Sequence, residues 1–283
     1  DIALRTILMP GDEVLIPEPS FVSYKPCAIM AGGKAVVVPL HGENGFKLTV
    51  RDLEGLVTEK TKVLVFPYPG NPTGATMSKK DMEELCRFIC EKDLFVLSDE
   101  IYAELTYDEP HTSIASMPGM YERTLVINGF SKAFSMTGWR LGYAAGPKEL
   151  LEQMTKVHQF AIMCAPTTSQ YAAIEALKNC DRAVEEMKQE YNRRRRLVVS
   201  KLREMGLPCS DPSGAFYVFP CIRSTGMTSE EFCQKLLHQK KIAVVPGDAF
   251  GASGEGYVRI SYAYSVERLN MALTRISEFL QEL

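Results

Sequence analysis

The chain has 283 residues, of which 46% are hydrophobic and 24% are charged, a balance typical of a globular protein with room for one large core and a smaller one. Its formal net charge of −3 does not indicate a strongly charged partner, so we expect neither nucleic-acid nor membrane binding. The apolar runs are too short to span a bilayer and no leader pattern is found, so a cytoplasmic location is predicted.

Eight cysteines are spread along the chain without a C-x-x-C pair, a distribution unlike that of a secreted disulfide framework. Cys86 and Cys90 lie four residues apart on a helical pattern and could share a metal ion, but no further ligands complete the set. We therefore expect reduced, buried cysteines and no metal site.

In residues 13–146, short β-rich runs alternate with longer helical patterns, which is typical of βαβ units and a mainly parallel sheet covered on both faces. Ser78 is expected as the N-cap of one helix, with Asp81 in its first turn. The expected helices of this half are residues 2–9, 21–31, 49–56 and 78–91, and the expected strands are 13–16, 35–38, 62–66, 94–98, 124–128 and 141–145.

After Pro147 the pattern changes to long helices and then to a mixed segment. Helices are expected at 148–160, 167–177, 181–205, 229–239 and 266–283, and strands at 215–219, 242–245 and 257–261. We predict a large α/β domain in residues 1–165, connecting long helices in 166–205 and a small C-terminal α+β domain in 206–283. The basic run at 193–196 is balanced by glutamates on the same helix and does not indicate nucleic acid.

Three polar motifs fall just beyond expected parallel strands: Asn71-Pro72-Thr73-Gly74, Asp99-Glu100-Ile101-Tyr102 and Ser131-Lys132. Each alone has a simpler explanation, since Asn-Pro-Thr-Gly is a common turn, a carboxylate after a strand often caps a helix and a loop lysine is usually solvated. The carboxyl ends of parallel strands, however, meet at one edge of a sheet, where ligands bind in a crevice. Together the three motifs predict a binding site.

Residues 130–142, FSKAFSMTGWRLG, resemble the cofactor-lysine signature of class I/II aminotransferases, and the asparagine, aspartate-to-tyrosine and later arginine motifs occur in the family's order. The similarity covers essentially the whole chain and points to the bacterial branch with aromatic-type and N-acetyl-diaminopimelate-type enzymes. The resemblance implies a fold-type-I α/β architecture, in which a large domain with a mainly parallel, seven-stranded sheet between helices is joined to a smaller C-terminal α+β domain. It also implies pyridoxal 5'-phosphate (PLP) as the cofactor.

The resemblance assigns two tasks to Lys132: its amine holds the cofactor aldehyde as an imine, and it later carries a proton to and from the substrate Cα. Both tasks need a lysine whose pKa is lowered by burial or by neighbouring cations. Asp99 matches the carboxylate that faces the pyridine nitrogen and keeps it protonated, whereas Glu100 is expected to point elsewhere.

Five further positions match cofactor contacts of the family. Asn71 and Tyr102 match the neutral donors to the cofactor's phenolic oxygen. Arg140 and Ser131 match groups that bind the phosphate. Phe21 falls where relatives stack an aromatic ring on the cofactor, although a core phenylalanine at the start of a helix is the alternative.

Arg259 lies inside an otherwise apolar strand pattern, where packing does not explain it. A guanidinium fork binds an α-carboxylate at two points, so we expect Arg259, together with Asn71, to hold the substrate carboxylate. One position departs from the family: Gly129 stands three residues before Lys132, where many relatives carry Ser or Thr, so one phosphate contact is lost or is made by the backbone.

The resemblance implies an aminotransferase that moves the amino group of an L-amino acid to a 2-oxo acid by a ping-pong mechanism. The alternatives are a PLP-dependent C–S β-lyase, because the fold also serves eliminations, and a catalytically incomplete PLP-binding fragment. The chain starts at Asp1 inside a helical pattern, and the family's N-terminal phosphate loop and gate strand are not visible, so an N-terminal truncation is expected. A homodimer is expected because relatives build each site at a two-fold interface. The pattern does not predict which side chains are accepted.

Overall fold

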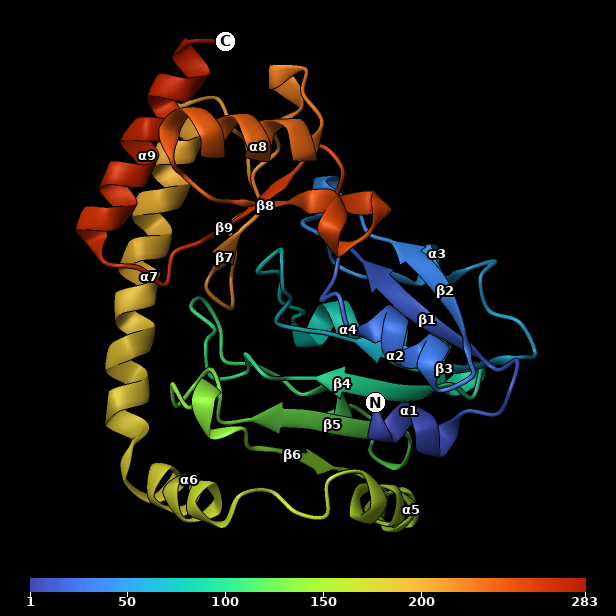
Figure 1. The fold of residues 1–283 in the computed structure, drawn as a ribbon. Helices are drawn as coiled ribbons and strands as arrows, with labels where there is room; N and C mark the ends of the chain where they lie inside the picture. Colours follow the sequence, from blue (N-terminus) through green and yellow to red (C-terminus); the bar gives the residue numbers. More distant parts are fainter.

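The computed structural model describes residues 1–283, which form two sheets with helices around them (Figure 1). The larger sheet has six strands in the order β2-β1-β3-β4-β5-β6, all parallel except β6, which runs antiparallel to β5. Its strands are β1 (Glu13–Glu18), β2 (Lys34–Pro39), β3 (Thr61–Phe66), β4 (Phe95–Asp99), β5 (Thr124–Gly129) and β6 (Gly142–Ala145). The mainly parallel α/β arrangement is confirmed, but these residues supply six strands where seven were expected.

Each face of the large sheet carries its own apolar core, because successive side chains of a strand point to opposite faces. The helices over it are α1 (Ile2–Ile7), α2 (Tyr24–Met30), α3 (Val50–Leu53), α4 (Lys79–Glu91) and α5 (Lys148–Ala161). Val63 and Val65 of β3 belong to the core shared with α1, α2 and α5. Leu64 and Phe66 of the same strand belong to the core shared with α3 and α4. Burial on both faces accounts for the nearly continuous apolar runs in the sequence.

Helix α4 begins as the sequence predicts. The Ser78 hydroxyl accepts a hydrogen bond from the backbone N–H of Asp81, and the Asp81 carboxylate accepts one from the backbone N–H of Ser78. This reciprocal pair satisfies two backbone donors that the first turn would otherwise leave free.

The smaller sheet follows a long helix that runs along one side of the molecule (Figure 1). The elements of this part are α6 (Thr167–Asn179), α7 (Asp181–Glu204), β7 (Tyr217–Val218), α8 (Ser229–Lys240), β8 (Val245–Pro246), β9 (Val258–Ser261) and α9 (Val266–Gln281). Its strands are antiparallel in the order β7-β9-β8, and α7, α8 and α9 share one apolar core with β7 and β9. The boundaries proposed at residues 165 and 205 stay a prediction.

Contacts on α7 and on the loop after β2 are among those that join the two parts. Arg195 of α7 donates to both carboxylate oxygens of Asp108 at 3.0 Å, and Asp108 lies in the segment that follows β4. On the opposite side, Phe46 packs edge-on against Phe219 and Tyr257, with ring centres 5.6 and 5.3 Å away. These contacts fix where β7 and β9 lie relative to the edge of the large sheet. None of the helices combines the length and apolar character needed to cross a membrane.

Candidate functional site

The polar motifs of the sequence meet at the carboxyl edge of the large sheet. Asp99 is the last residue of β4, Asn71 lies in the loop after β3, and Lys132 lies in the turn after β5. In Figure 1 the arrowheads of β4 and β5 point toward the side of the molecule that holds β7 and α7. The crevice expected where the three motifs meet therefore lies between the large sheet and the small sheet.

One cavity of about 740 Å³ brings together every residue that the sequence predicted for the site. These residues are Phe21, Asn71, Asp99, Tyr102, Ser131, Lys132, Arg140 and Arg259. All but Arg259 come from loops and strand ends of the large sheet, and Arg259 lies on β9. The convergence of distant motifs is thus observed, while the role of each residue is a separate question.

The amine of Lys132 is free of any carboxylate partner. Its Nζ lies 5.9 Å from the ring centre of Tyr102 and 5.8 Å from that of Phe216. Burial lowers the pKa of Lys132, the positive charges of Arg259 and Arg140 lower it further, and only Asp99 acts in the opposite direction. More of the amine is therefore neutral at physiological pH than for a solvated lysine, as both of its expected tasks need.

The carboxylate of Asp99 is held by two donors. Its Oδ2 accepts a hydrogen bond of 2.7 Å from the Tyr24 hydroxyl, and its Oδ1 accepts one of 3.1 Å from the backbone N–H of Ile101. Burial raises the pKa of Asp99 and Glu100 adds to that rise, while the two donors and Lys132 oppose it. A positively charged group bound directly to Asp99 would lower its pKa and so favour the charged carboxylate. Tyr24 was missed by the sequence reasoning, because nothing local links it to a residue 75 positions away.

The side chain of Glu100 points away from the cavity, as expected. Its carboxylate accepts hydrogen bonds from Ser98 (2.9 Å) and Ser113 (2.6 Å) and pairs with His111 Nε2 (2.9 Å). Burial alone would raise the pKa of Glu100, but the partners His111, Ser113 and Ser98 outweigh it and lower the pKa. Glu100 thus ties the segment after β4 to the sheet.

Arg259 is partly buried and has no acidic partner. Its Nη1 donates to Asn71 Oδ1 at 2.8 Å, whereas its Nε is buried and makes no hydrogen bond. The centre of the guanidinium lies 4.5 Å from the ring centre of Tyr217 and 4.8 Å from that of Phe250, so it is held between two aromatic rings. A buried N–H without a partner is costly, and an anionic ligand on the guanidinium would offset that cost.

The predicted phosphate-binding segment lies at the mouth of the cavity. Arg140 has a left-handed backbone (φ 54°), and its Nη1 contacts the carbonyl of Thr137 at 3.0 Å rather than a carboxylate. At Gly129 a Cβ would come within 3.0 Å of Gly142 Cα on β6, so a side chain there would require the two strands to shift. Phe21 lines the cavity and is 42% exposed, which disfavours the core-phenylalanine alternative.

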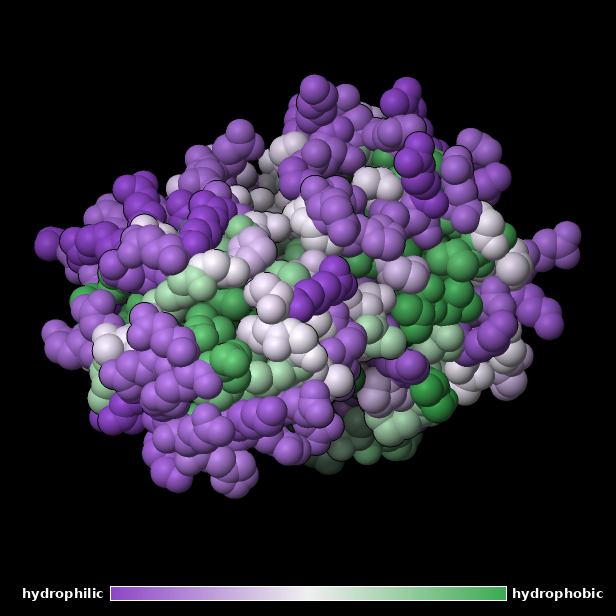
Figure 2. Space-filling model, turned by 90° about the horizontal axis from the view of Figure 1, so that it is seen from above, coloured by the Kyte–Doolittle hydropathy of each residue, from purple (hydrophilic) through white to green (hydrophobic).

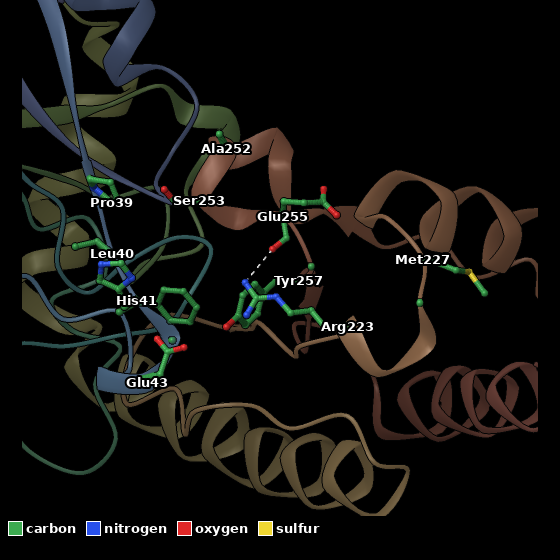
Figure 3. Close-up of a pocket in the computed structure, with 14 residues that line it drawn as sticks. Pro39, Leu40, His41, Glu43, Arg223, Met227, Ala252, Ser253, Glu255 and Tyr257 are labelled. Atoms are coloured by element: carbon green, nitrogen blue, oxygen red, sulfur yellow. Dashed lines mark hydrogen bonds between the residues drawn. The ribbon is translucent and has the colours of Figure 1, made fainter.

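A second cavity, of about 580 Å³, contains none of the predicted residues (Figure 3). It lies between the segment after β2, with His41 and Glu43, and loops of the small sheet. There the Arg223 guanidinium lies 5.0 Å from the ring centre of Tyr257 and donates to the Glu255 carbonyl at 3.5 Å. Its charged groups are exposed, so it offers no buried acid or base comparable to Asp99 and Lys132.

Comparison with known proteins identifies the family. The family model described as aminotransferase class I and II matches residues 1–276. The chain belongs to the class I and II aminotransferases. This aminotransferase is 53% identical, over 99% of its length, to a Pyrococcus abyssi protein named aspartate aminotransferase, and it covers 73% of that protein. It is 51% identical to Thermococcus litoralis aromatic-amino-acid aminotransferase 2, again over 99% of its own length and 73% of the relative's.

The fold of the aminotransferase agrees with solved structures. It matches the crystal structure of an aromatic aminotransferase from Pyrococcus horikoshii with a TM-score of 0.97 and 52% identity, covering 99% of this chain and 76% of that one. The predicted family, fold type I and PLP dependence are confirmed. The protein is a PLP-dependent aminotransferase acting on amino acids and 2-oxo acids, and the C–S β-lyase alternative is not favoured.

The residues of the 740 Å³ cavity fit the cofactor. Lys132 is an amine with a lowered pKa, and Asp99 is a carboxylate without a cation in direct contact. Arg140 has no carboxylate competing for its guanidinium. The amide oxygen of Asn71 already accepts from Arg259, which leaves its NH₂ group as a donor. The amine of Lys132, the carboxylate of Asp99, the NH₂ group of Asn71 and the guanidinium of Arg140 therefore match, in that order, the aldehyde, the ring nitrogen, the phenolic oxygen and the phosphate of PLP.

Proposed function

We propose that this aminotransferase binds PLP at the carboxyl edge of the large sheet and transfers amino groups there between amino acids and 2-oxo acids. The observation that carries the assignment is the convergence of all eight candidate residues on one cavity. When bound, PLP supplies an aldehyde that takes up the amino group and a ring that draws electrons from the substrate Cα. The chain's own residues position the reactants and move protons.

Lys132 serves as the base and acid at the substrate Cα. Burial and the charges of Arg259 and Arg140 lower its pKa, so the neutral amine that removes the Cα proton is more populated. The same nitrogen, once protonated, returns the proton during the second half of the exchange. Asp99 keeps the ring nitrogen charged, and Tyr24 holds the carboxylate in place through its hydrogen bond of 2.7 Å.

Arg259 anchors the α-carboxylate common to every amino-acid substrate. Its Nε is buried, and Nη1 uses only one of its two protons on Asn71, so the outer edge formed by Nη1 and Nη2 is the one that meets the two carboxylate oxygens. Two-point binding holds the Cα beside Lys132, which lowers the entropic cost of reaching the reactive arrangement. Because the carboxylate is common to donor and acceptor, one anchor serves both halves of a ping-pong reaction.

The remaining residues hold the cofactor. Tyr102 and the Asn71 NH₂ group donate to the phenolic oxygen, and Arg140 and the Ser131 hydroxyl bind the phosphate. Phe21, partly exposed at the cavity, covers one face of the ring.

Reduction with borohydride tests the lysine assignment. The loaded wild-type protein should give a peptide containing Lys132 with the cofactor covalently attached, detected by mass spectrometry. Lys132→Ala should give no such adduct and no transamination. Lys156→Ala, an exposed lysine of α5, is the control and should behave as wild type. An adduct on another lysine in Lys132→Ala would refute the assignment.

We also propose that the aminotransferase is a homodimer. Large apolar residues on and beside α5 and α6 are exposed, with Phe160 at 95%, Met163 at 75% and Tyr171 at 69%. These helices lie at the bottom of Figure 1, whereas Figure 2 shows the upper side, where hydrophilic residues predominate and apolar ones gather in patches between them. An apolar face of this kind suits burial against a second copy.

Sedimentation of the active protein tests the dimer. The expected result is a species of twice the chain mass, and Phe160→Asp should shift it toward the monomer because it places a charge in the apolar face. Tyr121→Asp, at a residue 74% exposed outside that face, is the matched control. Full activity in a monomeric wild type would contradict the proposal. The cytoplasmic location stays a prediction.

A further inference from the structure

Tyr217 of β7 contacts two of the proposed binding groups, Tyr102 and Arg259. Tyr217 is 7% exposed and lines the 740 Å³ cavity. Its hydroxyl lies 3.2 Å from the hydroxyl of Tyr102, and its ring centre lies 4.5 Å from the guanidinium centre of Arg259. One side chain therefore touches the proposed donor to the cofactor and the proposed anchor of the substrate.

We propose that Tyr217 is a positioning residue that couples the substrate-carboxylate anchor Arg259 to the cofactor donor Tyr102. The inference rests on the proposed function, which places Tyr102 at the phenolic oxygen and Arg259 at the carboxylate. It goes beyond that function because it connects Tyr102 and Arg259 through a single residue of β7.

The hydroxyl half of the coupling follows from proton counting. Tyr102 has a single hydroxyl proton, so when it donates to the cofactor, its oxygen is left as an acceptor. The Tyr217 hydroxyl is within hydrogen-bond distance to donate to that oxygen. Both residues are buried, where such chains polarise one another and the outer donor strengthens the inner one. Tyr217 would thus fix the direction of the Tyr102 hydroxyl and make it a better donor.

The ring half of the coupling follows from how Arg259 is held. Without an acidic partner, the guanidinium is kept in place by Asn71 and by the rings of Tyr217 and Phe250. Aromatic faces attract a cation without occupying its N–H groups, so the Nη groups stay available to a carboxylate. When a carboxylate binds, the guanidinium of Arg259 shifts and the Tyr217 ring that packs on it shifts too. This changes the contact between the Tyr217 and Tyr102 hydroxyls.

Two variants of the loaded enzyme separate the two halves. Tyr217→Phe keeps the ring and removes the hydroxyl, whereas Phe250→Leu removes one ring from Arg259 and leaves the hydroxyl pair intact. Two properties are measured for each: the pH titration of the visible absorbance of the bound cofactor, and the dissociation constant of an unreactive acid, 3-phenylpropionate. Neither property is a turnover rate.

A weaker Tyr102 donor stabilises the deprotonated chromophore less, so its apparent pKa rises. For Tyr217→Phe the acid dissociation constant of the visible band should therefore fall by roughly 3- to 10-fold, with 3-phenylpropionate binding within about 2-fold of wild type. For Phe250→Leu the pattern should reverse: the band titrates as in wild type, and the acid binds roughly 3- to 10-fold more weakly. In the wild type, saturating acid should shift the titration, and in Tyr217→Phe that shift should be smaller.

Tyr102→Phe separates failure of this inference from failure of the proposed function. If Tyr102→Phe leaves the absorbance titration unchanged, Tyr102 does not contact the cofactor and the site assignment itself is wrong. If Tyr102→Phe shifts the titration but Tyr217→Phe does not, the site stands and the coupling through Tyr217 is refuted. Equal loss of acid binding in Tyr217→Phe and Tyr217→Leu would also refute it, because the ring alone is proposed to hold Arg259.

Discussion

Replacing Arg259 by lysine tests the anchor of the substrate most directly. Lysine keeps the positive charge but loses the planar fork, so two-point binding of a carboxylate is no longer possible. It also loses the fixed donor to Asn71 and the flat group that lies 4.5 and 4.8 Å from two ring centres. Single-point contact replaces two charge-assisted hydrogen bonds to the carboxylate.

Loss of that bidentate contact costs about 2–3 kcal/mol, which corresponds to a roughly 30- to 150-fold fall in kcat/KM. The assay compares several amino donors, acidic and aromatic ones among them, with 2-oxoglutarate as acceptor. The fall should be the same for every donor, because all share the α-carboxylate, and the visible spectrum of the resting enzyme should not change.

Arg223→Lys is the matched control, because Arg223 also lies against an aromatic ring, 5.0 Å from the ring centre of Tyr257, but in the second cavity. It should keep kcat/KM within about 2-fold, since surface substitutions away from a site have small effects. If Arg259→Lys impairs only one class of donor, the arginine contacts the substrate side chain, and the proposed placement of the substrate is wrong.

Three further predictions concern acidic residues. Asp99→Asn should keep the lysine-bound cofactor but lower kcat on the order of 100- to 1000-fold, because an amide cannot balance the ring's positive charge; normal turnover would remove Asp99 from the site. Glu100→Gln should lower the free energy of unfolding by about 1–3 kcal/mol in urea titrations, because it disturbs a buried carboxylate with three partners; an unchanged midpoint would contradict this. The hydrogen bonds from Arg195 lower the pKa of Asp108 in the folded protein. The ionised Asp108 therefore stabilises the fold above the ordinary aspartate pKa of about 3.9, and this contribution is lost as the pH falls through the lowered pKa. The urea midpoint should therefore fall more steeply with acid in the wild type than in Asp108→Asn, and parallel curves would refute the linkage.

The sequence predicted the elements of the large sheet well because their signals are local. Capping at Ser78 and the apolar runs of β3 and β4 are set by a few adjacent residues, and the helices and strands there lie within a few residues of their expected bounds. The helix expected from residue 21 begins instead at Tyr24, because the preceding residues turn toward the small sheet, where Ser20 N–H bonds to the Phe250 carbonyl. The small sheet was less well predicted, since β7 has two residues in place of the expected run 215–219.

The candidate site divides in the same way. Residues that belong to long motifs, such as Lys132 and Asp99, could be named from the sequence and lie at the cavity. Tyr24 and Tyr217 could not, because their importance lies in contacts with Asp99 and Tyr102 across 75 and 115 positions of sequence. Isolated tyrosines carry no pattern that distinguishes such contacts from ordinary packing.

The position of Arg259 on β9, apart from the other seven candidate residues, has a consequence for how such an enzyme can change over time. The large sheet supplies the groups proposed to hold the cofactor, and the small sheet supplies the arginine proposed to hold the substrate carboxylate. Substitutions in β7, β9 and their loops would therefore change how every substrate is placed beside the cofactor, because they act on an anchor common to all of them, while Lys132 stays in place on the large sheet.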